Sequence, residues 1–135
     1  MLEIRYVQRN DKEFWYHLDH HLPEKEFENK VREKRGYIIS ENGTPIGLLR
    51  YNLLWDNMPF CTMLFVDWDY QKKGYGKRLM DHWENDMKSQ GYDVLLVSTQ
   101  VDEEAQCFYR KMGYRDCGCI ILDQQPMEMF LMKKV

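Results

Sequence analysis

A short basic turn that contains two glycines is the part of this sequence best suited to chemistry. Residues 71–78 read QKKGYGKR, and they follow an apolar, β-branched run at residues 62–67 that predicts a buried strand. A helix that begins after such a turn has unpaired backbone N–H groups and the positive end of the helix dipole at its start. Gly74 and Gly76 would let a ligand approach that backbone without interference from a Cβ atom. The turn therefore predicts a phosphate-binding site.

The charge distribution favours an anionic ligand at this turn. Lys72, Lys73, Lys77 and Arg78 lie within seven residues, in a chain of 19 basic and 22 acidic residues with a net charge of −3. Cations at a helix N-terminus interact unfavourably with the positive end of the dipole, and a bound anion would offset that repulsion. The alternative is that these side chains are simply solvent-exposed charges at the start of the helix.

Two common nucleotide motifs do not fit the turn. A Walker A loop needs Gly-Lys followed by Ser or Thr, whereas Gly76-Lys77 is followed by Arg78. A dinucleotide-binding fingerprint needs a third glycine, where Leu79 stands, and an acid after the next strand, where residues 98–100 read STQ. The phosphate would thus belong to another kind of ligand.

Two segments resemble motifs of the GNAT superfamily of N-acetyltransferases. The pattern Gln71-x-x-Gly74-x-Gly76 is similar to the acetyl-CoA-binding turn of that family, which reads Arg/Gln-x-x-Gly-x-Gly/Ala. Residues 102–114, DEEAQCFYRKMGY, are similar to the family segment Asn-x-x-Ala-x-x-Phe-Tyr-x-Lys-x-Gly-Phe/Tyr, with Asp102 in place of the usual Asn. The expected order of strands and helices is also that of the family, so the resemblance covers essentially the whole chain.

The resemblance implies that acetyl-CoA is the cosubstrate. The residues that it assigns to acetyl-CoA lie at the end of the strand, in the turn and on a later helix: Phe65, Val66, Gln71, Lys72, Lys73, Gly74, Tyr75, Gly76, Lys77, Asp102 and Phe108. In the family, the Asn that Asp102 replaces often contacts the pantetheine arm. The alternative role for Asp102 is that of a helix N-cap.

Acetyl transfer to an amine needs a neutral amine, a donor to the developing oxyanion and a proton for the departing thiolate. The resemblance places Tyr109 beside the leaving sulfur, where its phenol could donate that proton. The alternative is a core tyrosine on a buried helix face. The backbone N–H of Val66 is the expected donor to the thioester oxygen. Asp67 could accept the amine's proton, recognise a cationic substrate, or be a surface acid.

The hydrophobic pattern predicts one α/β (α+β) domain over residues 1–135, with a single mixed, mostly antiparallel sheet of about seven strands and helices on both faces, as in the GNAT fold. Strands are expected at residues 2–7, 36–40, 45–55, 62–67, 93–99, 114–122 and 127–135, with turns at 41–43 and 56–59. Helices are expected at residues 10–22, 23–35, 74–90 and 102–112, the third with a buried stripe of Leu79, Met80, Trp83 and Met87. The strand–helix–strand unit around residues 74–90 predicts parallel pairing.

The composition excludes several other classes. The acidic net charge argues against nucleic-acid binding, and no run of ~18 apolar residues predicts a membrane span. The start of the chain lacks the apolar core of a signal peptide, so we expect a cytoplasmic protein with reduced cysteines. His17 and His21 share a helix face but lack a third ligand, so no metal site is expected. Cys117 and Cys119 are expected to be buried in strand packing.

The expected function is that of an N-acetyltransferase that moves an acetyl group from acetyl-CoA to the primary amine of a small molecule by direct attack. Six acids between residues 11 and 28 could form an acidic wall for a cationic amine, or could simply be the solvated faces of two helices. The alternatives are a non-catalytic CoA-binding module, acting as a sensor or partner, and acetylation of a protein amine. A homodimer through the last strands fits the size and the family.

Overall fold

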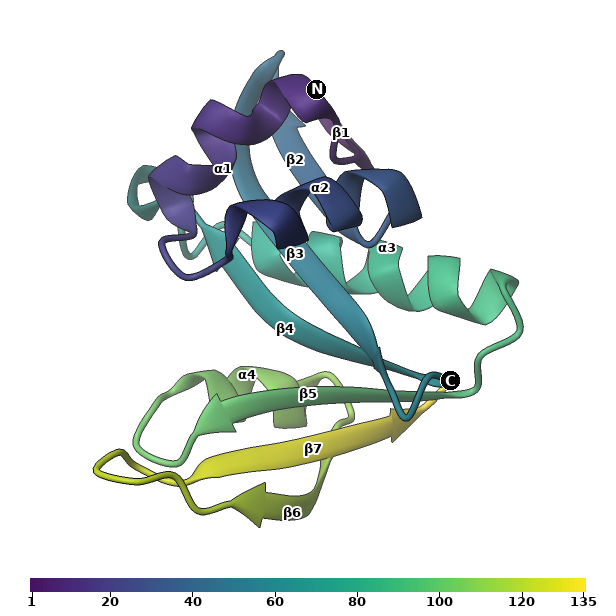
Figure 1. The fold of residues 1–135 in the computed structure, drawn as a ribbon, viewed down its shortest axis with the longest axis vertical. Coiled ribbons are helices and arrows are strands. Elements are labelled where there is room, and N and C mark those ends of the chain that lie inside the picture. The colour runs from purple at the N-terminus through teal and green to yellow at the C-terminus, as the bar shows by residue number, and fades with distance from the viewer. The chain divides into compact units, whose positions relative to one another are not determined.

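The computed structural model describes residues 1–135 and forms seven strands and four α-helices (Figure 1). The strands are β1 (Leu2–Tyr6), β2 (Gly36–Glu41), β3 (Thr44–Leu54), β4 (Met58–Val66), β5 (Val94–Gln100), β6 (Arg115–Ile120) and β7 (Glu128–Lys134). The α-helices are α1 (Lys12–Leu18), α2 (Glu24–Glu33), α3 (Tyr75–Ser89) and α4 (Ala105–Lys111), and two short 3₁₀ helices are η1 (Arg9–Asp11) and η2 (Trp68–Tyr70). None of these helices combines the length and apolar character needed to cross a bilayer.

The strands form a seven-stranded sheet in the order β1-β2-β3-β4-β5-β7-β6. β2 is antiparallel to β1 and β3, and β7 is antiparallel to β5 and β6. β4 and β5 pair in parallel, with Phe60 opposite Leu96 and Cys61 opposite Val97, as the crossover through α3 requires. This mixed, mostly antiparallel sheet is the fold class predicted from the sequence.

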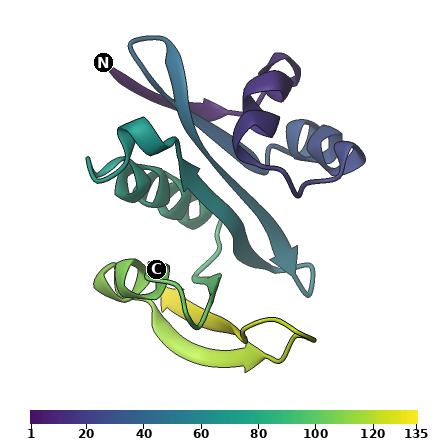
Figure 2. The same ribbon diagram turned by 90° about the vertical axis from the view of Figure 1, so that its left-hand side faces the viewer.

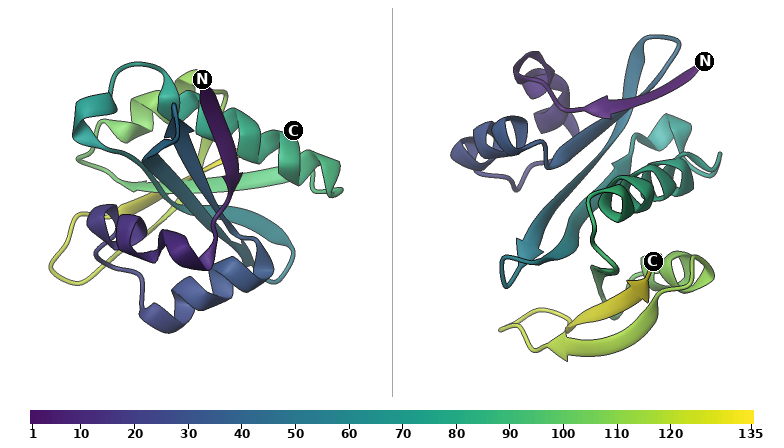
Figure 3. Two further views of the ribbon diagram at one scale, coloured as in Figure 1. Left: turned by 90° about the horizontal axis from the view of Figure 1, so that it is seen from above. Right: turned by 90° about the vertical axis from the view of Figure 1, so that its right-hand side faces the viewer.

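The chain divides into two compact units. The first contains Met1–Tyr51 and Met63–Asn85, and the second contains Asn52–Thr62 and Asp86–Val135. Within the first unit, α1 and α2 lie on one face of the strands and α3 lies on the other (Figure 2). The right-hand view of Figure 3 shows the same two layers from the opposite side. The predicted placement of helices on both faces is therefore confirmed.

The face of the first unit that carries α1 and α2 has an aromatic core. Trp15 of α1 and Phe27 of α2 pack with Ile38 and Leu48 of the strands. The Trp15 and Phe27 rings meet edge-on, with centroids 5.7 Å apart and an interplanar angle of 65°. Burial of each such side chain contributes roughly 1.5–3 kcal/mol, so this core fixes both helices on the sheet.

The opposite face of the first unit is covered by α3. The predicted stripe is confirmed, since Leu79, Met80, Trp83 and Met87 are all fully buried. The ring of Trp83 lies 5.9 Å from that of Tyr51 on β3, centroid to centroid. This packing fixes the start of α3, and with it the basic turn, against the strands.

The second unit is built on β5, β7 and β6, with β7 in the middle (Figure 1). Leu95, Val97 and Leu131 are fully buried in it. The rings of Tyr109 on α4 and Tyr114 also pack together, edge to face, with centroids 6.0 Å apart. β6 is the edge strand, and all of its residues are exposed.

Two of the expected helix boundaries are wrong. Helix α1 ends at Leu18 rather than at residue 22, because the Asp19 carboxylate turns inward to accept hydrogen bonds from other parts of the unit. Helix α4 begins at Ala105 with Glu104 at its N-cap, so Asp102 does not cap it. The side chain of Glu103 instead accepts the backbone N–H of Gln100 at 3.1 Å, which holds the preceding residues in a turn.

Two expectations about strands are also wrong. β4 begins at Met58, because the turn is completed before it by Trp55 and Asp56, both in the left-handed region with φ of 54° and 65°. Cys117 and Cys119 are exposed rather than buried. They lie on the edge strand β6, which no further strand covers, and the register of β6 shifts between Asp116 and Gly118.

Candidate functional site

The segment between β4 and α3 forms a closed loop that leads into the basic turn. The backbone N–H of Tyr70 donates to the Asp67 carbonyl at 2.8 Å, which closes the first turn of η2. The side-chain amide of Gln71 donates to the Val66 carbonyl at 2.8 Å and ties the end of the loop to the end of the strand. Gln71, assigned to the cofactor by its motif, thus also shapes the loop that presents the two glycines.

Gly74 ends the turn and begins the helix. Its φ of +84° lies in the left-handed region that side chains disfavour, and a Cβ atom added there would meet no atom within 4 Å. Its carbonyl accepts the backbone N–H of Arg78 at 3.1 Å, the first hydrogen bond of α3. The backbone N–H groups of Tyr75, Gly76 and Lys77 have no acceptor within the protein. Three donors therefore point out of the helix start beside open space, as an anion site requires.

The four cations of the turn differ in their surroundings, although all four are exposed. Lys77 donates to Asp81 one helical turn later, at 2.9 Å. The ammonium of Lys73 lies 5.6 Å from the centroid of the Tyr70 ring. Lys72 and Arg78 take part in no ion pair, so they are the cations most available to a phosphate.

Tyr75 links the start of α3 to another strand. Its hydroxyl donates to the Glu41 carboxylate at the end of β2, and this bond to a carboxylate raises the pKa of Tyr75. The side chain of Tyr75 thus stabilises the turn from the side, while its backbone N–H is one of the three free donors.

The end of β4 carries the residues expected to face the thioester. Phe65 packs against the core that α1 and α2 form, and Val66 is buried. A Cβ atom added to Gly47 on β3 would lie 2.9 Å from the Phe65 carbonyl oxygen and 3.3 Å from the Val66 Cα. A glycine is therefore required at position 47 for β3 to approach β4 this closely.

Asp67 follows Val66 directly and has a partner that sequence reasoning missed. Its backbone N–H donates to the Ile46 carbonyl at 2.8 Å, so β3 fixes its position. Its carboxylate lies 3.8 Å from Nε2 of His17 on α1. No local pattern links these two residues, because 50 positions of sequence separate them. The structure contains no group of three or more histidine, cysteine or acidic side chains that could hold a metal ion.

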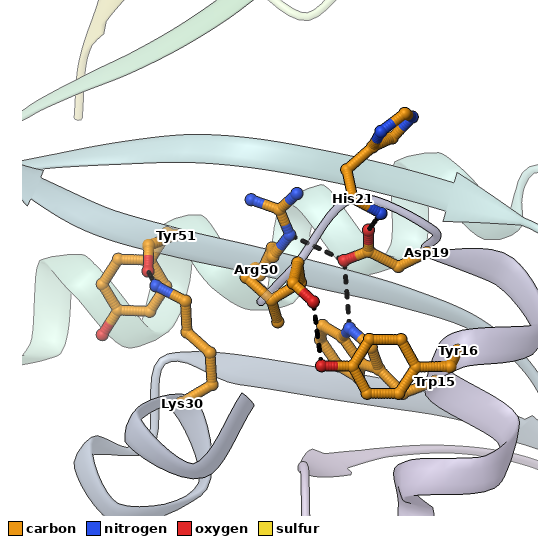
Figure 4. Close-up of polar contacts among 8 residues, drawn as sticks. Trp15, Tyr16, Asp19, His21, Lys30, Arg50 and Tyr51 are labelled. Carbon is orange, nitrogen blue, oxygen red and sulfur yellow. Dashed lines mark hydrogen bonds and ion pairs between the residues drawn. The ribbon is translucent and has the colours of Figure 1, made fainter. Parts of the chain in front are cut away.

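A buried polar cluster holds the segment after α1 on the sheet (Figure 4). Asp19 is completely buried and accepts hydrogen bonds from Trp15 Nε1 at 3.0 Å and from Arg50 Nε at 2.8 Å. Its other oxygen accepts the backbone N–H of His21 at 3.1 Å. Burial by itself would raise the pKa of Asp19, but the hydrogen bond and charge of Arg50 outweigh it and keep that pKa below its usual range.

Lys30 belongs to the same layer and is almost completely buried. Its ammonium donates to the Tyr51 carbonyl on β3 at 2.9 Å (Figure 4). Burial, together with the nearby positive charge of Arg50, lowers the pKa of Lys30 to about 8. A cation thus anchors α2 to the sheet from inside the protein.

These contacts change the interpretation of the acids between residues 11 and 28. Asp11 is buried and forms a two-pronged ion pair with Arg5, at 2.7 and 2.9 Å. Asp19 is turned inward to Arg50, and Glu24 forms an ion pair with Lys12. Glu26 also accepts a hydrogen bond from the side-chain amide of Asn29 at 2.9 Å. At least four of the six acids therefore serve internal or local contacts, which weakens the interpretation of these acids as a wall for a substrate.

Tyr109, the expected proton donor, lies in the second unit. It is buried, with 6% of its surface exposed, between aromatic neighbours Phe108 and Tyr114. Its hydroxyl has no hydrogen-bond partner within the protein. Burial raises the pKa of Tyr109 far above its ordinary value, and the nearby Cys61, Glu103 and Glu128 raise it further. Its phenol therefore stays protonated at neutral pH.

The two other cofactor residues expected in the second unit differ in exposure. Asp102 is fully on the surface, in the turn that precedes α4. Phe108 is half-buried, and its ring centroid lies 5.3 Å from that of Tyr109. Cofactor contacts of Asp102 and Phe108 remain predictions.

The comparisons with known proteins identify the class. The profile of the Acetyltransferase (GNAT) family matches residues 3–114. No curated protein sequence matches. Among solved structures, the chain is similar to the ribosomal-protein-S18-alanine N-acetyltransferase of Escherichia coli, with 20% identity, coverage of 100% of this chain and 94% of that one, and a TM-score of 0.83.

Two further structures with the same fold contain coenzyme A or a conjugate of it. Arabidopsis thaliana Naa50, in complex with the bisubstrate analogue CoA-Ac-MVNAL, is 16% identical, with 99% of each chain covered and a TM-score of 0.82. The N-acetylglutamate synthase of Neisseria gonorrhoeae, complexed with coenzyme A and N-acetyl-glutamate, is 15% identical, with 99% of this chain and 35% of that one covered and a TM-score of 0.80.

The fold and the family profile together define the class as that of acetyl-CoA-dependent N-acetyltransferases. The profile covers well over half of the sequence, and the structural neighbours extend the shared fold across nearly all of it. This protein belongs to the GNAT acetyltransferase family.

Proposed function

We propose that this protein transfers an acetyl group from acetyl-CoA to the primary amine of a small molecule, with residues 1–135 acting as one domain. The observation that carries the proposal is the start of α3, where three backbone N–H groups lack an acceptor beside exposed cations and an open Gly74. The diphosphate of CoA matches this site in charge and in the number of acceptor oxygens.

The chemistry of the remaining residues supports transfer rather than binding alone. Acetyl transfer forms a C–N bond and breaks the C–S bond of the thioester, and the departing thiolate takes a proton. Tyr109 has a protonated hydroxyl without an internal partner, which suits it to supply that proton. The Val66 N–H is the proposed donor to the developing oxyanion, and Asp67 the proposed contact for the amine.

The proposal is tested by binding and turnover measured on the same preparation. Isothermal titration with acetyl-CoA measures the binding step, and a thiol-release assay over a panel of small primary amines measures transfer. Binding with amine-dependent release of CoA supports the proposal. Binding without any release above background would support a CoA-binding module, and lack of binding would refute the whole assignment.

The same panel separates small-molecule from protein acceptors. Of the similar structures, one carries a peptide-like CoA conjugate and another carries N-acetyl-glutamate, so the fold admits both kinds of acceptor. Short peptides with free N-termini are therefore included beside the small amines. Faster turnover of peptides than of every small amine would replace the proposed acceptor by a protein terminus.

A further inference from the structure

The pair formed by His17 and Asp67 lies at the surface, outside the buried polar cluster around Asp19. The side chain of His17 is 68% exposed and that of Asp67 is 27% exposed, so solvent and small molecules can reach the pair. His17 is on α1 and Asp67 directly follows Val66 at the end of β4. An imidazole and a carboxylate from two separate elements thus meet 3.8 Å apart at the end of the strand that is proposed to hold the thioester.

An exposed tryptophan lies beside this pair. Trp68 follows Asp67 and is 74% exposed, which is unusual for a side chain of this size. Its ring meets the edge of Phe65, with centroids 5.6 Å apart and an interplanar angle of 84°. Because Phe65 packs into the core under α1 and α2, this contact places Trp68 on the α1 side of β4. The Asp67 carboxylate shares that side, since it lies 3.8 Å from His17 on α1.

We propose that His17, Asp67 and Trp68 form the subsite for the acceptor, a protonated primary amine on an apolar group, and that His17 accepts the amine's proton. The inference rests on the proposed acetyl transfer and names the substrate class of that site. The Asp67 carboxylate attracts the ammonium group, and the Trp68 ring offers a face for the cation and its apolar neighbour. Asp67 also stabilises the imidazolium that forms on His17.

The proton balance of the reaction assigns a role to each group. An alkylammonium, with a pKa near ~10, carries three protons on nitrogen and cannot attack. His17 takes one proton and later releases it to solvent, and the amine lone pair then attacks the thioester carbonyl. The C–S bond breaks, the thiolate takes a proton from Tyr109, the second ammonium proton restores the phenol, and the third stays on the amide nitrogen. No oxidant, metal or further reactant is needed.

The charged surroundings of His17 are few. Asp67 faces its ring from the end of β4, and Glu13 lies one turn earlier on α1. His20 contacts the His17 carbonyl through Nε2 at 3.2 Å. The Asp19 carboxylate is turned away into the buried cluster. Asp67 is thus the charged group that faces the His17 ring most directly.

The test compares His17→Gln with His21→Gln, a substitution at an exposed histidine in the neighbouring loop whose ring points away from the buried cluster (Figure 4). Two acceptors are used: an alkylamine, which is protonated at neutral pH, and an arylamine, which is already neutral. His17→Gln should lower kcat/KM for the alkylamine about a hundredfold near pH 7 and leave the arylamine close to wild type. His21→Gln should leave both acceptors unchanged.

The results separate this inference from the proposed function. An equal loss of kcat/KM for both acceptors, or an unchanged kcat/KM for the alkylamine, would overturn the role of His17. Asp67→Asn provides a second, independent test. It should raise KM for the alkylamine and leave the Kd for acetyl-CoA unchanged. An unchanged KM would overturn the subsite. If the wild type itself binds acetyl-CoA but acetylates no amine, the proposed function fails, and this inference fails with it.

Discussion

The buried ammonium of Lys30 makes the stability of this protein depend on pH in a way that can be calculated. Lys30 is 2% exposed, and its pKa is lowered to about 8 from the ordinary 10.5. Between these two pH values the unfolded chain binds more protons than the folded one. The free energy of unfolding therefore rises with pH through this window, because deprotonation removes the penalty for burying a charge.

The size of the effect follows from the shift. A difference of about 2.5 pKa units corresponds to about 3.4 kcal/mol, of which about 2.5 kcal/mol should be regained between pH 7 and pH 10. In Lys30→Met the side chain has similar length and no charge, so this contribution is absent. The difference in unfolding free energy between wild type and Lys30→Met should thus shift by about 2.5 kcal/mol in favour of the wild type over that range.

Urea unfolding followed by tryptophan fluorescence, at several pH values from 7 to 10, measures this difference directly. Other groups that titrate in the same range cancel, because both proteins contain them. Lys25→Met, which replaces an exposed lysine on the same helix, is the matched control and should show no such dependence. A difference between wild type and Lys30→Met that stays constant across the range would refute the argument, since Lys30 would then titrate alike in both states.

Three further substitutions test the site. Gly74→Ala forces a side chain into the left-handed region at a cost of about 1–2 kcal/mol, so the Kd for acetyl-CoA measured by calorimetry should rise roughly tenfold. The control Gly118→Ala, at an open position without a positive φ, should leave that Kd unchanged. Gly47→Ala should lower the melting temperature by pressing on the Phe65 carbonyl, with a loss of about 1–3 kcal/mol, and an unchanged melting curve would contradict the close approach of the two strands. Tyr109→Phe should lower kcat about a hundredfold with an unchanged Kd, and because the pKa of Tyr109 is raised, the wild type should show no activity loss from its ionisation up to about pH 10. Full turnover by the Phe variant would exclude Tyr109 as the proton donor.

The local features of this protein could be predicted from the sequence because each depends on neighbouring residues. The turn before α3 follows from the conformational freedom of Gly74, and the buried stripe of α3 follows from helical spacing. The parallel pairing of β4 with β5 follows from the handedness of a strand–helix–strand connection. The same local signals carried the family resemblance, which the fold and the family profile bear out.

Contacts between distant residues were decided only by the tertiary structure. In the sequence, Asp19 looks like any acid at the end of a helix. Only the structure shows that it is buried and paired with Arg50 of β3. The pairing of His17 with Asp67 depends on how α1 lies over the end of β4. Cys117 is exposed because β6 is an edge strand, a property of strand order rather than of local composition. Burial and charge pairing are properties of the packed chain, and no local pattern encodes which distant group becomes a neighbour.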